Sequence, residues 1–309
     1  MDRVDWAEAM RNRWSKTKDP ITTDANEVFV GAVRTPCEPN VARGDACGNK
    51  TNYGELATVM QKYWGILKNP HTDRAKAFVK RCRSDVVERN GNSYNYYRQG
   101  DGPTVVLVHG LHSNLGTMAP IAEELVAQGF GVVLFDAPAH GEAIGTTTDP
   151  IEVRDVIRKI GQRLGEIHAI VWHSLGGAWA LYAWNEDFHA KTLVSIASPA
   201  TYRFVVDSFI QMHRLRKDVA EGVVKEMEDN FGKAVWDEMS AAEVAKTIGV
   251  PGLIIHGKND ESVPPAHAHE IHSNWPNSRL EIVEGVGHLD VLRSLEVKGL
   301  VTRHLRESV

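Results

Sequence analysis

The feature that most constrains the fold is a series of short apolar runs, rich in β-branched residues, that recurs along the chain. The runs occupy residues 104–108, 131–135, 169–172, 192–196 and 252–255, and a weaker run follows at 280–283. Apolar runs of this length, bounded by turn residues, are typical of strands that are buried on both faces of a sheet. We therefore predict a sheet whose strands are mostly parallel.

Amphipathic stretches separate these runs and complete the fold prediction. Residues 119–128, residues 150–164 and a stretch after Ser174 carry apolar stripes at helical spacing. An alternation of strands and helices is typical of right-handed crossovers and of a sheet that helices cover on both faces. The sequence therefore predicts an α/β fold with a mostly parallel, doubly wound sheet.

Residues 201–248 interrupt the alternation, because their apolar pattern indicates helices only. The segment lies between two predicted strands, at the end of the sheet where loops gather. An excursion at this point predicts a helical lid over a ligand site. The alternative is a set of ordinary packing helices.

The chain divides near residue 84 into an N-terminal extension, residues 1–84, and a second region, residues 85–309. The extension is polar and irregular, with weak helical patterns at 6–14 and 53–66, and has no catalytic motif. Residues 85–97 predict a hairpin that turns at Asn90-Gly91. The extension would pack over the lid, contact a second subunit of a homo-oligomer, or dock another partner.

Composition and charge exclude several classes of function. Apolar residues make up 42% of the chain and the net charge is −5, so no basic field is available to bind nucleic acid. No apolar run is long enough to span a membrane, and charges occupy the N-terminus where a signal peptide needs apolar residues. The three cysteines, Cys37, Cys47 and Cys82, indicate reduced thiols rather than a disulfide framework. We expect a cytoplasmic protein.

Candidate catalytic side chains follow the predicted strands. In open parallel sheets, ligands bind beyond the carboxyl ends of the strands. The run W-H-S-L-G-G (172–177) places Ser174 on a sharp turn between a strand and the N-terminus of a helix, which favours developing negative charge. Three further runs follow other strands: H-G-L-H (109–112), H-G-K-N-D-E-S-V-P (256–264) and the glycine-rich E-G-V-G-H-L-D (284–290).

These four runs together resemble the α/β-hydrolase family, in its branch of esterase-, lipase- and thioesterase-like serine hydrolases. Residues 172–176 resemble the G-x-S-x-G nucleophile elbow, except that Trp172 replaces the first glycine. A tryptophan there implies either a reshaped turn or a site that has drifted from hydrolysis. Residues 136–141, D-A-P-A-H-G, resemble a family loop in which Asp136 and His140 are structural. The resemblance covers residues 85–309 only.

The resemblance implies a role for each catalytic residue. Ser174 would be the nucleophile, Asp260 the acid and His288 the general base, in the order that the family uses. A base must take the serine proton during attack, and an acid must hold that base in the right tautomer. By position, the backbone amides of Leu111 and Leu175 would form the oxyanion hole.

The implied activity is hydrolysis of a carboxylic ester, or of a thioester or amide, through an acyl-enzyme on Ser174. Acyl transfer and C–C bond hydrolysis at the same site are alternatives, and so is a non-catalytic ligand-binding protein on this fold. The substrate would be a small acyl compound, and no cofactor or metal is implied. The residues predicted to contact the substrate are His112, Trp172, His173, Phe204 and Phe209.

One histidine cluster has the spacing of a metal site. His267, His269 and His272 lie close together after two prolines. Metal ligands show such spacing, but the surrounding residues indicate an exposed helix. We therefore predict a solvated helix surface and no metal.

Overall fold

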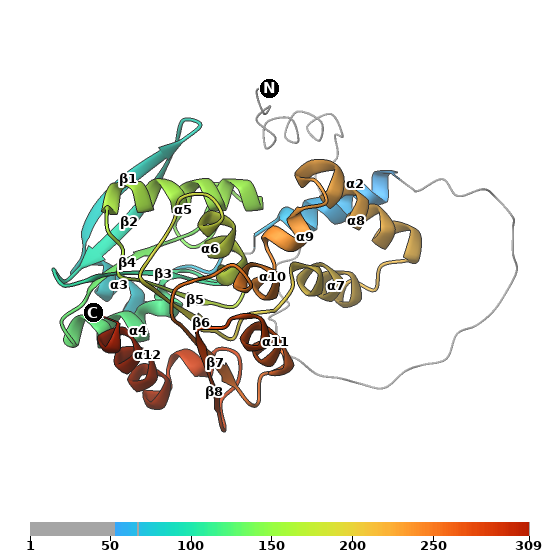
Figure 1. Cartoon of the computed structure of the whole chain (residues 1–309). Helices are drawn as coiled ribbons and strands as arrows, with labels where there is room; N and C mark the ends of the chain where they lie inside the picture. The colour runs from blue at the N-terminus through green and yellow to red at the C-terminus, as the bar shows by residue number, and fades with distance from the viewer. Residues whose placement is uncertain (1–52, 67, 309) are drawn as a thin grey trace, which may run out of the picture.

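Eight strands form one sheet within residues 53–66 and 68–308, which the computed structural model describes (Figure 1). The strands are β1 (Arg83–Arg89), β2 (Asn92–Gln99), β3 (Thr104–Val108), β4 (Gly131–Phe135), β5 (Ala169–His173), β6 (Thr192–Ile196), β7 (Gly252–Gly257) and β8 (Ser278–Val283). Their spatial order is β1-β2-β4-β3-β5-β6-β7-β8. β2 is antiparallel to β1 and β4, and all other neighbours are parallel. The predicted mostly parallel sheet is confirmed.

The antiparallel edge of the sheet is the hairpin expected from the sequence. Arg89 pairs with Asn92, so Asn90 and Gly91 alone form the turn. Their φ angles are 49° and 78°. Two positive φ values define a type I′ turn, whose twist matches that of the flanking strands and which favours Asn-Gly. The hairpin extends the parallel strands into an eight-stranded sheet.

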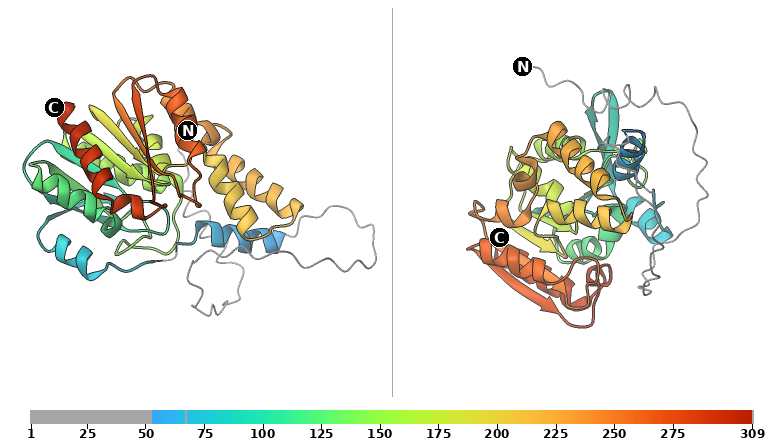
Figure 2. Two further views of the ribbon diagram at one scale, coloured as in Figure 1. Left: turned by 90° about the horizontal axis from the view of Figure 1, so that it is seen from below. Right: turned by 90° about the vertical axis from the view of Figure 1, so that its right-hand side faces the viewer.

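Helices cover both faces of the sheet (Figures 1 and 2). They are α2 (Tyr53–Trp64), α3 (Asp73–Val79), α4 (Leu115–Ala127), α5 (Pro150–Leu164), α6 (Gly176–Trp184), α7 (Tyr202–Met212), α8 (Lys217–Phe231), α9 (Val235–Glu238), α10 (Ala241–Ala245), α11 (Ala266–Asn274) and α12 (Leu295–Glu307), with a short 3-10 turn, η1 (Asp290–Leu292).

Alternate residues of β3 show how the strands divide the core. Val105 and Leu107 pack with α3, α4 and α12 on one face, whereas Val106 and Val108 pack with α5 and α6 on the other. All four side chains are buried. A strand with both faces buried gains from continuous apolar sequence, which explains the uninterrupted runs. The doubly wound α/β architecture is therefore confirmed.

Helix α4 begins at Leu115, earlier than the predicted start at residue 119. The side chain of Asn114 caps the helix by accepting a hydrogen bond from the amide of Gly116, at 2.9 Å. Pro120 lies inside the helix without disrupting its first turns. The chain between β3 and α4 is therefore a loop only up to Asn114.

Helices α7, α8, α9 and α10 form the insertion predicted for residues 201–248. Helices α7, α8 and α9 project beyond one end of the sheet, whereas α10 packs with α6 and α11 (Figure 1). Helix α2, from the N-terminal extension, lies along this insertion (Figure 2). The ring of Tyr63 packs edge-on against Phe209, with centroids 4.9 Å apart, and Trp64 packs against Phe231 at 5.5 Å. Helix α2 therefore packs on the insertion, which is one of the three placements that the sequence left open for the extension. The helical pattern at 6–14, Cys37 and Cys47 lie outside the described residues.

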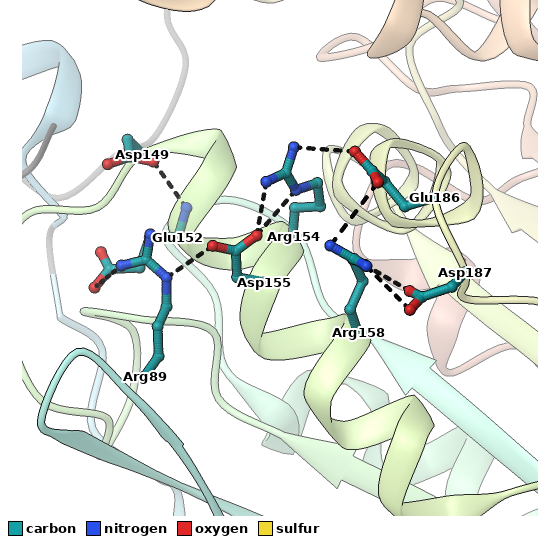
Figure 3. Close-up of polar contacts among 8 residues, drawn as sticks. All are labelled: Arg89, Asp149, Glu152, Arg154, Asp155, Arg158, Glu186 and Asp187. Atoms are coloured by element: carbon teal, nitrogen blue, oxygen red, sulfur yellow. Dashed lines mark hydrogen bonds and ion pairs between the residues drawn. The ribbon is translucent and has the colours of Figure 1, made fainter. Parts of the chain in front are cut away.

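Ion pairs fasten the hairpin to α5, and α5 to the loop after α6 (Figure 3). Arg89 Nε lies 3.1 Å from Asp155 Oδ2, and Arg154 NH2 lies 2.8 Å from Asp155 Oδ1. The buried Arg154 guanidinium also stacks 4.9 Å above the ring of Tyr182. Further pairs are Arg89–Glu152, Arg154–Glu186, Arg158–Glu186 and Arg158–Asp187.

Asp149, at the edge of this network, is a buried carboxylate whose ionisation opposes folding. Its side chain caps α5 by accepting a hydrogen bond from the amide of Glu152, at 2.8 Å. Burial, together with the charge of Glu152, nevertheless raises the pKa of Asp149 to about 6. A carboxyl group with a raised folded-state pKa contributes stability that is present at low pH and lost as the pH rises through that pKa.

The substitution Asp149→Asn should therefore stabilise the protein at pH 8, where it removes a buried charge and keeps a capping side chain. We expect a gain of about 1–2 kcal/mol at pH 8 that shrinks below pH 6 and vanishes near pH 4, measured by urea unfolding across this range. Asp187→Asn provides the control of opposite sign. The hydrogen bond with Arg158 lowers the pKa of Asp187 to about 2, so its removal should destabilise at pH 8. A gain for Asp149→Asn that does not depend on pH would contradict this interpretation.

Candidate active site

Ser174 occupies a strained turn between β5 and α6. Its φ angle is 53°, which is uncommon for a residue with a side chain. The backbone amide of Ser174 donates to the carbonyl of Ile196 in β6, at 2.9 Å. A Cβ on Gly176 would lie 2.5 Å from the carbonyl oxygen of His109, so only glycine permits α6 to start this close to the end of β3. The turn thus lifts the serine above the carboxyl edge of the sheet.

Trp172, at the first elbow position, is buried and leaves the turn undisturbed. It is 1% exposed, and its indole nitrogen donates to Ser195 Oγ at 3.1 Å. A Cβ on Gly177 would lie 2.6 Å from that nitrogen, so the ring occupies space that the glycine leaves free under α6. The prediction that Trp172 binds substrate is corrected, because its ring packs in the core.

The three residues predicted as a triad meet at the carboxyl edge of the sheet. Ser174 follows β5, Asp260 follows β7 and His288 follows β8. The distance from Ser174 Oγ to His288 Nε2 is 3.0 Å, and His288 Nδ1 lies 2.7 Å from Asp260 Oδ2. The side chain of His288 is 19% exposed, whereas that of Asp260 is fully buried. An unbroken series of hydrogen bonds therefore connects the serine hydroxyl to a buried carboxylate.

Asp260 is held as a charged acceptor. Its Oδ1 accepts the backbone amides of Ser262 and Val263, both at 2.9 Å, and its Oδ2 lies 3.4 Å from His256 Nε2. Burial opposes the charged form, but the imidazoles of His256 and His288 and the amide of Val263 outweigh it and hold the pKa of Asp260 well below its usual range. The carboxylate is therefore ionised at neutral pH.

Two backbone amides lie free beside the serine. Leu175 is the N-cap residue of α6, and Leu111 lies in the turn after β3. Among the described residues, no group accepts a hydrogen bond from either amide. A Cβ on Gly110 would lie 3.0 Å from Ser174 Cβ, so the turn that carries Leu111 lies against the elbow.

The other predicted substrate residues are spread around the site. His112 is exposed, and the ring of Phe204 packs against His267 with centroids 4.2 Å apart. Substrate binding by His112 and Phe204 stays a prediction. Phe209 packs against Tyr63, and substrate binding by Phe209 also stays a prediction. His173 is buried at 2% exposure, which corrects its predicted contact with substrate; its partner is the backbone of His288.

Asp136 organises the loop after β4, as the sequence suggested. Its oxygens accept hydrogen bonds from the amides of Leu115, at 2.8 Å, and Glu142, at 2.9 Å. His71 of the N-terminal extension also binds it, at 2.7 Å, and both side chains are buried. Burial disfavours protonation of His71, but Asp136 outweighs it and raises the pKa of His71. This contact joins the extension to the edge of the site.

Two further side chains, not predicted from the sequence, support the triad. His256 lies beside Asp260, and Ser198 Oγ donates to the carbonyl of Ser174 at 3.1 Å. The signal for His256 was its place in the run 256–264, directly before the glycine of the acid motif. Ser198 had no comparable signal, because a serine after a strand is common in turns.

The three clustered histidines do not converge. His267 Nδ1 accepts the amide of Ala200 at 3.2 Å, and His272 Nδ1 lies 2.8 Å from Ser278 Oγ. Within residues 53–66 and 68–308, no group of three or more histidine, cysteine, aspartate or glutamate side chains is arranged to hold a metal ion. Nor does this part of the chain contain a helix long and apolar enough to cross a membrane.

The packing of Trp172 against Gly177 yields a stability prediction. Gly177→Ala should destabilise the protein by about 1–3 kcal/mol, because the new methyl group would overlap the indole ring. Gly299→Ala, in an exposed turn of α12 with open space around the position, is the control and should stabilise by about 0.5–1 kcal/mol. Thermal unfolding of both variants measures the difference. Equal effects, or no relief when Trp172→Val is added to Gly177→Ala, would rule out the proposed overlap.

The chain is similar in sequence and in structure to several known proteins. Over 232 residues, the chain is 24% identical to the pimeloyl-[acyl-carrier protein] methyl ester esterase of Xanthomonas campestris pv. campestris (strain B100), covering 62% of this chain and 90% of that protein. A solved esterase of Pyrococcus furiosus superposes with a TM-score of 0.60 at 18% identity, covering 78% of this chain and 97% of the other. The meta-cleavage product hydrolase of Pseudomonas fluorescens IP01 gives 0.55 at 19% identity, covering 73% and 98%.

The two structures show that the fold is shared. The family model for the alpha/beta hydrolase family matches residues 105–297, which is well over half of the chain. This match contains all four runs that follow strands β3, β5, β7 and β8, and so includes the serine, the carboxylate and the histidine described above. The chain belongs to the alpha/beta hydrolase family.

Proposed function

We propose that this protein is a serine hydrolase that cleaves carboxylic esters through an acyl-enzyme on Ser174. The observation that carries the proposal is the hydrogen-bonded series Ser174–His288–Asp260, with successive distances of 3.0 and 2.7 Å. The names of the relatives, a methyl ester esterase and an esterase, support an ester rather than another acyl compound.

The hydrogen bonds define the proton path. Because Asp260 is ionised and only accepts, Nδ1 of His288 carries a proton and Nε2 is the acceptor that faces the serine hydroxyl. As Ser174 Oγ attacks the ester carbonyl, His288 takes its proton, and Asp260 stabilises the resulting imidazolium. The strained turn keeps the hydroxyl at the open edge of the sheet.

The free amides of Leu111 and Leu175 then hold the oxyanion of the tetrahedral intermediate, and the N-terminus of α6 adds its dipole. Collapse of the intermediate breaks the ester C–O bond, and His288 returns the proton to the departing alcohol. A water molecule next attacks the acyl-enzyme with His288 as base. The second collapse releases the carboxylic acid and restores the Ser174 hydroxyl.

The helical insertion α7–α10 would act as a lid over this site. Its two ends are fastened together, since the amide of Ala242 donates to the carbonyl of Ala200 and the amide of Tyr202 donates to Ser240 Oγ, both at 2.9 Å. Phe204, near its start, reaches His267 beside the acid loop. These contacts support a lid whose outer helices, α7 to α9, move as a unit about a narrow base, while α10 stays packed on α6 and α11.

The alternatives differ in what they require of this site. Acyl transfer and C–C bond hydrolysis would use the same triad, and the meta-cleavage product hydrolase shares the fold. A thioester or amide would need only a different leaving group. The non-catalytic alternative depended on Trp172, and the burial of that ring beside Gly177 removes its support. Product analysis on ester substrates in the presence of alcohols separates hydrolysis from transfer.

A fluorophosphonate probe tests the proposal directly. We expect the wild-type protein to be labelled at Ser174 and to hydrolyse p-nitrophenyl esters. Ser174→Ala should lose labelling and at least about 1,000-fold in kcat while keeping its unfolding temperature. Ser84→Ala, at an exposed position of β1, is the matched control and should behave as wild type. Turnover by Ser174→Ala, or labelling at another serine, would disprove the assignment.

Chelation provides a second test of the mechanism, because no step uses a metal ion. Overnight dialysis against EDTA should leave the rate of ester hydrolysis and the rate of probe labelling unchanged. Supplementation with zinc, manganese or magnesium should not raise either rate. A reversible loss of activity on chelation would contradict a mechanism that depends on Ser174, His288 and Asp260 alone.

A further inference from the structure

We propose that His173 is a positioning residue, which holds the loop carrying His288 at the distance from Ser174 that proton transfer requires. This inference rests on the serine hydrolase function proposed above. His173 is the last residue of β5 and directly precedes Ser174 in the sequence. Its side chain contacts the backbone of the loop rather than a reacting atom.

The imidazole of His173 is neutral and carries its proton on Nε2. Burial, together with the nearby His288, lowers the pKa of His173 to about 3. Nε2 lies 2.8 Å from the carbonyl oxygen of His288, whereas the buried Nδ1 has no hydrogen-bond partner in the part of the chain described. A carbonyl oxygen can only accept, so Nε2–H is the donor.

Two contacts therefore join His288 to the elbow, and they act on different parts of the residue. Its side chain reaches Ser174 Oγ at 3.0 Å, and its backbone carbonyl accepts from His173 at 2.8 Å. Because His173 and Ser174 share a peptide bond, the two contacts close a small ring of covalent and hydrogen bonds. The two imidazoles also pack together, with centroids 4.7 Å apart. A shift of the His288 backbone would stretch one contact or the other.

The rest of the loop is fastened to a different strand. The amide of Asn259 donates to the carbonyl of Val286 at 3.1 Å, and the amide of Gly285 donates to Asn259 Oδ1 at 3.2 Å. These bonds fix the loop relative to β7 and Asp260, but not relative to β5. His173 supplies the connection to the strand that carries the serine. Its loss would leave the acid and base aligned while the base drifts from the nucleophile.

Drift of this kind affects the chemical step more than binding. A misplacement of about 1 Å between reacting groups costs on the order of 100-fold in rate. Because His173 does not reach the substrate, its removal should lower kcat and leave KM nearly unchanged. The rate of fluorophosphonate labelling, which also depends on proton transfer from Ser174, should fall in parallel.

Two polar substitutions separate the hydrogen bond from general disruption. In His173→Gln, the amide nitrogen reaches the position of Nε2, whereas in His173→Asn it falls short. We expect His173→Asn to lose about 10–100-fold in kcat with KM changed less than about threefold, and His173→Gln to lose less than about fivefold. The rate of p-nitrophenyl butyrate hydrolysis is divided by the concentration of sites that the probe labels at completion. A variant that only folds less completely then shows an unchanged kcat.

His168 provides the matched control. It is buried at the opposite end of β5, and its Nε2 lies 2.9 Å from the carbonyl oxygen of Leu305. His168→Asn removes the same kind of hydrogen bond far from Ser174, so it should lower the unfolding temperature without changing kcat per labelled site. Wild-type kcat in His173→Asn, equal losses in the Gln and Asn variants, or a rise in KM alone would overturn the proposal.

A nitrogen NMR spectrum of the histidine side chains tests the hydrogen bond from His173 to the His288 carbonyl, and it does not depend on the folding of the Asn variant. In the wild-type protein, His173 should show an Nε2–H proton protected from solvent exchange and an unprotonated Nδ1, assigned by their loss in His173→Gln. A protonated Nδ1 or a rapidly exchanging Nε2–H would overturn the proposed contact. Absence of both labelling and ester turnover in the wild-type protein would instead contradict the proposed function itself.

Discussion

The arrangement of the site depends on how closely α6 approaches the carboxyl ends of β3 and β5. The amide of Ser174 is bound to β6, and the first residues of α6 press on the carbonyl of His109. Such an approach forces the chain into a positive φ at Ser174, which is costly for a residue with a side chain. Contacts with the surrounding strands hold the turn in this conformation. The exposed hydroxyl, the free amide of Leu175 and the helix dipole all follow from the one sharp turn.

Burial then sets the electrostatics around that turn. Burial lowers the pKa of His109, and it lowers the pKa values of His140 and His173 to about 3, so these imidazoles stay neutral next to the site. Asp260, in contrast, stays charged because backbone amides and imidazoles surround its oxygens. The proposed imidazolium of His288 would thus form beside one carboxylate and several neutral rings. At the low dielectric constant of a buried site, that single opposite charge stabilises the imidazolium more than it would in water.

Much of this arrangement was predictable from local sequence. The apolar runs gave the strands, because a strand buried on both faces needs continuous apolar residues, and Ser174, Asp260 and His288 each stand in a short run directly after a strand. The contacts that escaped prediction join segments far apart in the chain. His71 meets Asp136, and the side chain of Trp172 occupies the space beside Gly177, which no local pattern reports. The early start of α4 was not predicted because Gly116, in the first turn of the helix, resembles a loop residue, although the Asn114 cap begins the helix there.

Helix α2 joins the described part of the N-terminal extension to the helical insertion. The hydroxyl of Tyr63 in α2 lies 3.1 Å from that of Tyr202, and the amide of Tyr202 is bound to Ser240 at the base of the helical insertion. Helix α2 is thus attached to the base of the insertion as well as to its length through Phe209 and Phe231. If the insertion moves as a lid, α2 either moves with it or must release these aromatic contacts. In the second case, the loss of these contacts adds to the energy of opening, which a separate N-terminal appendage would not do.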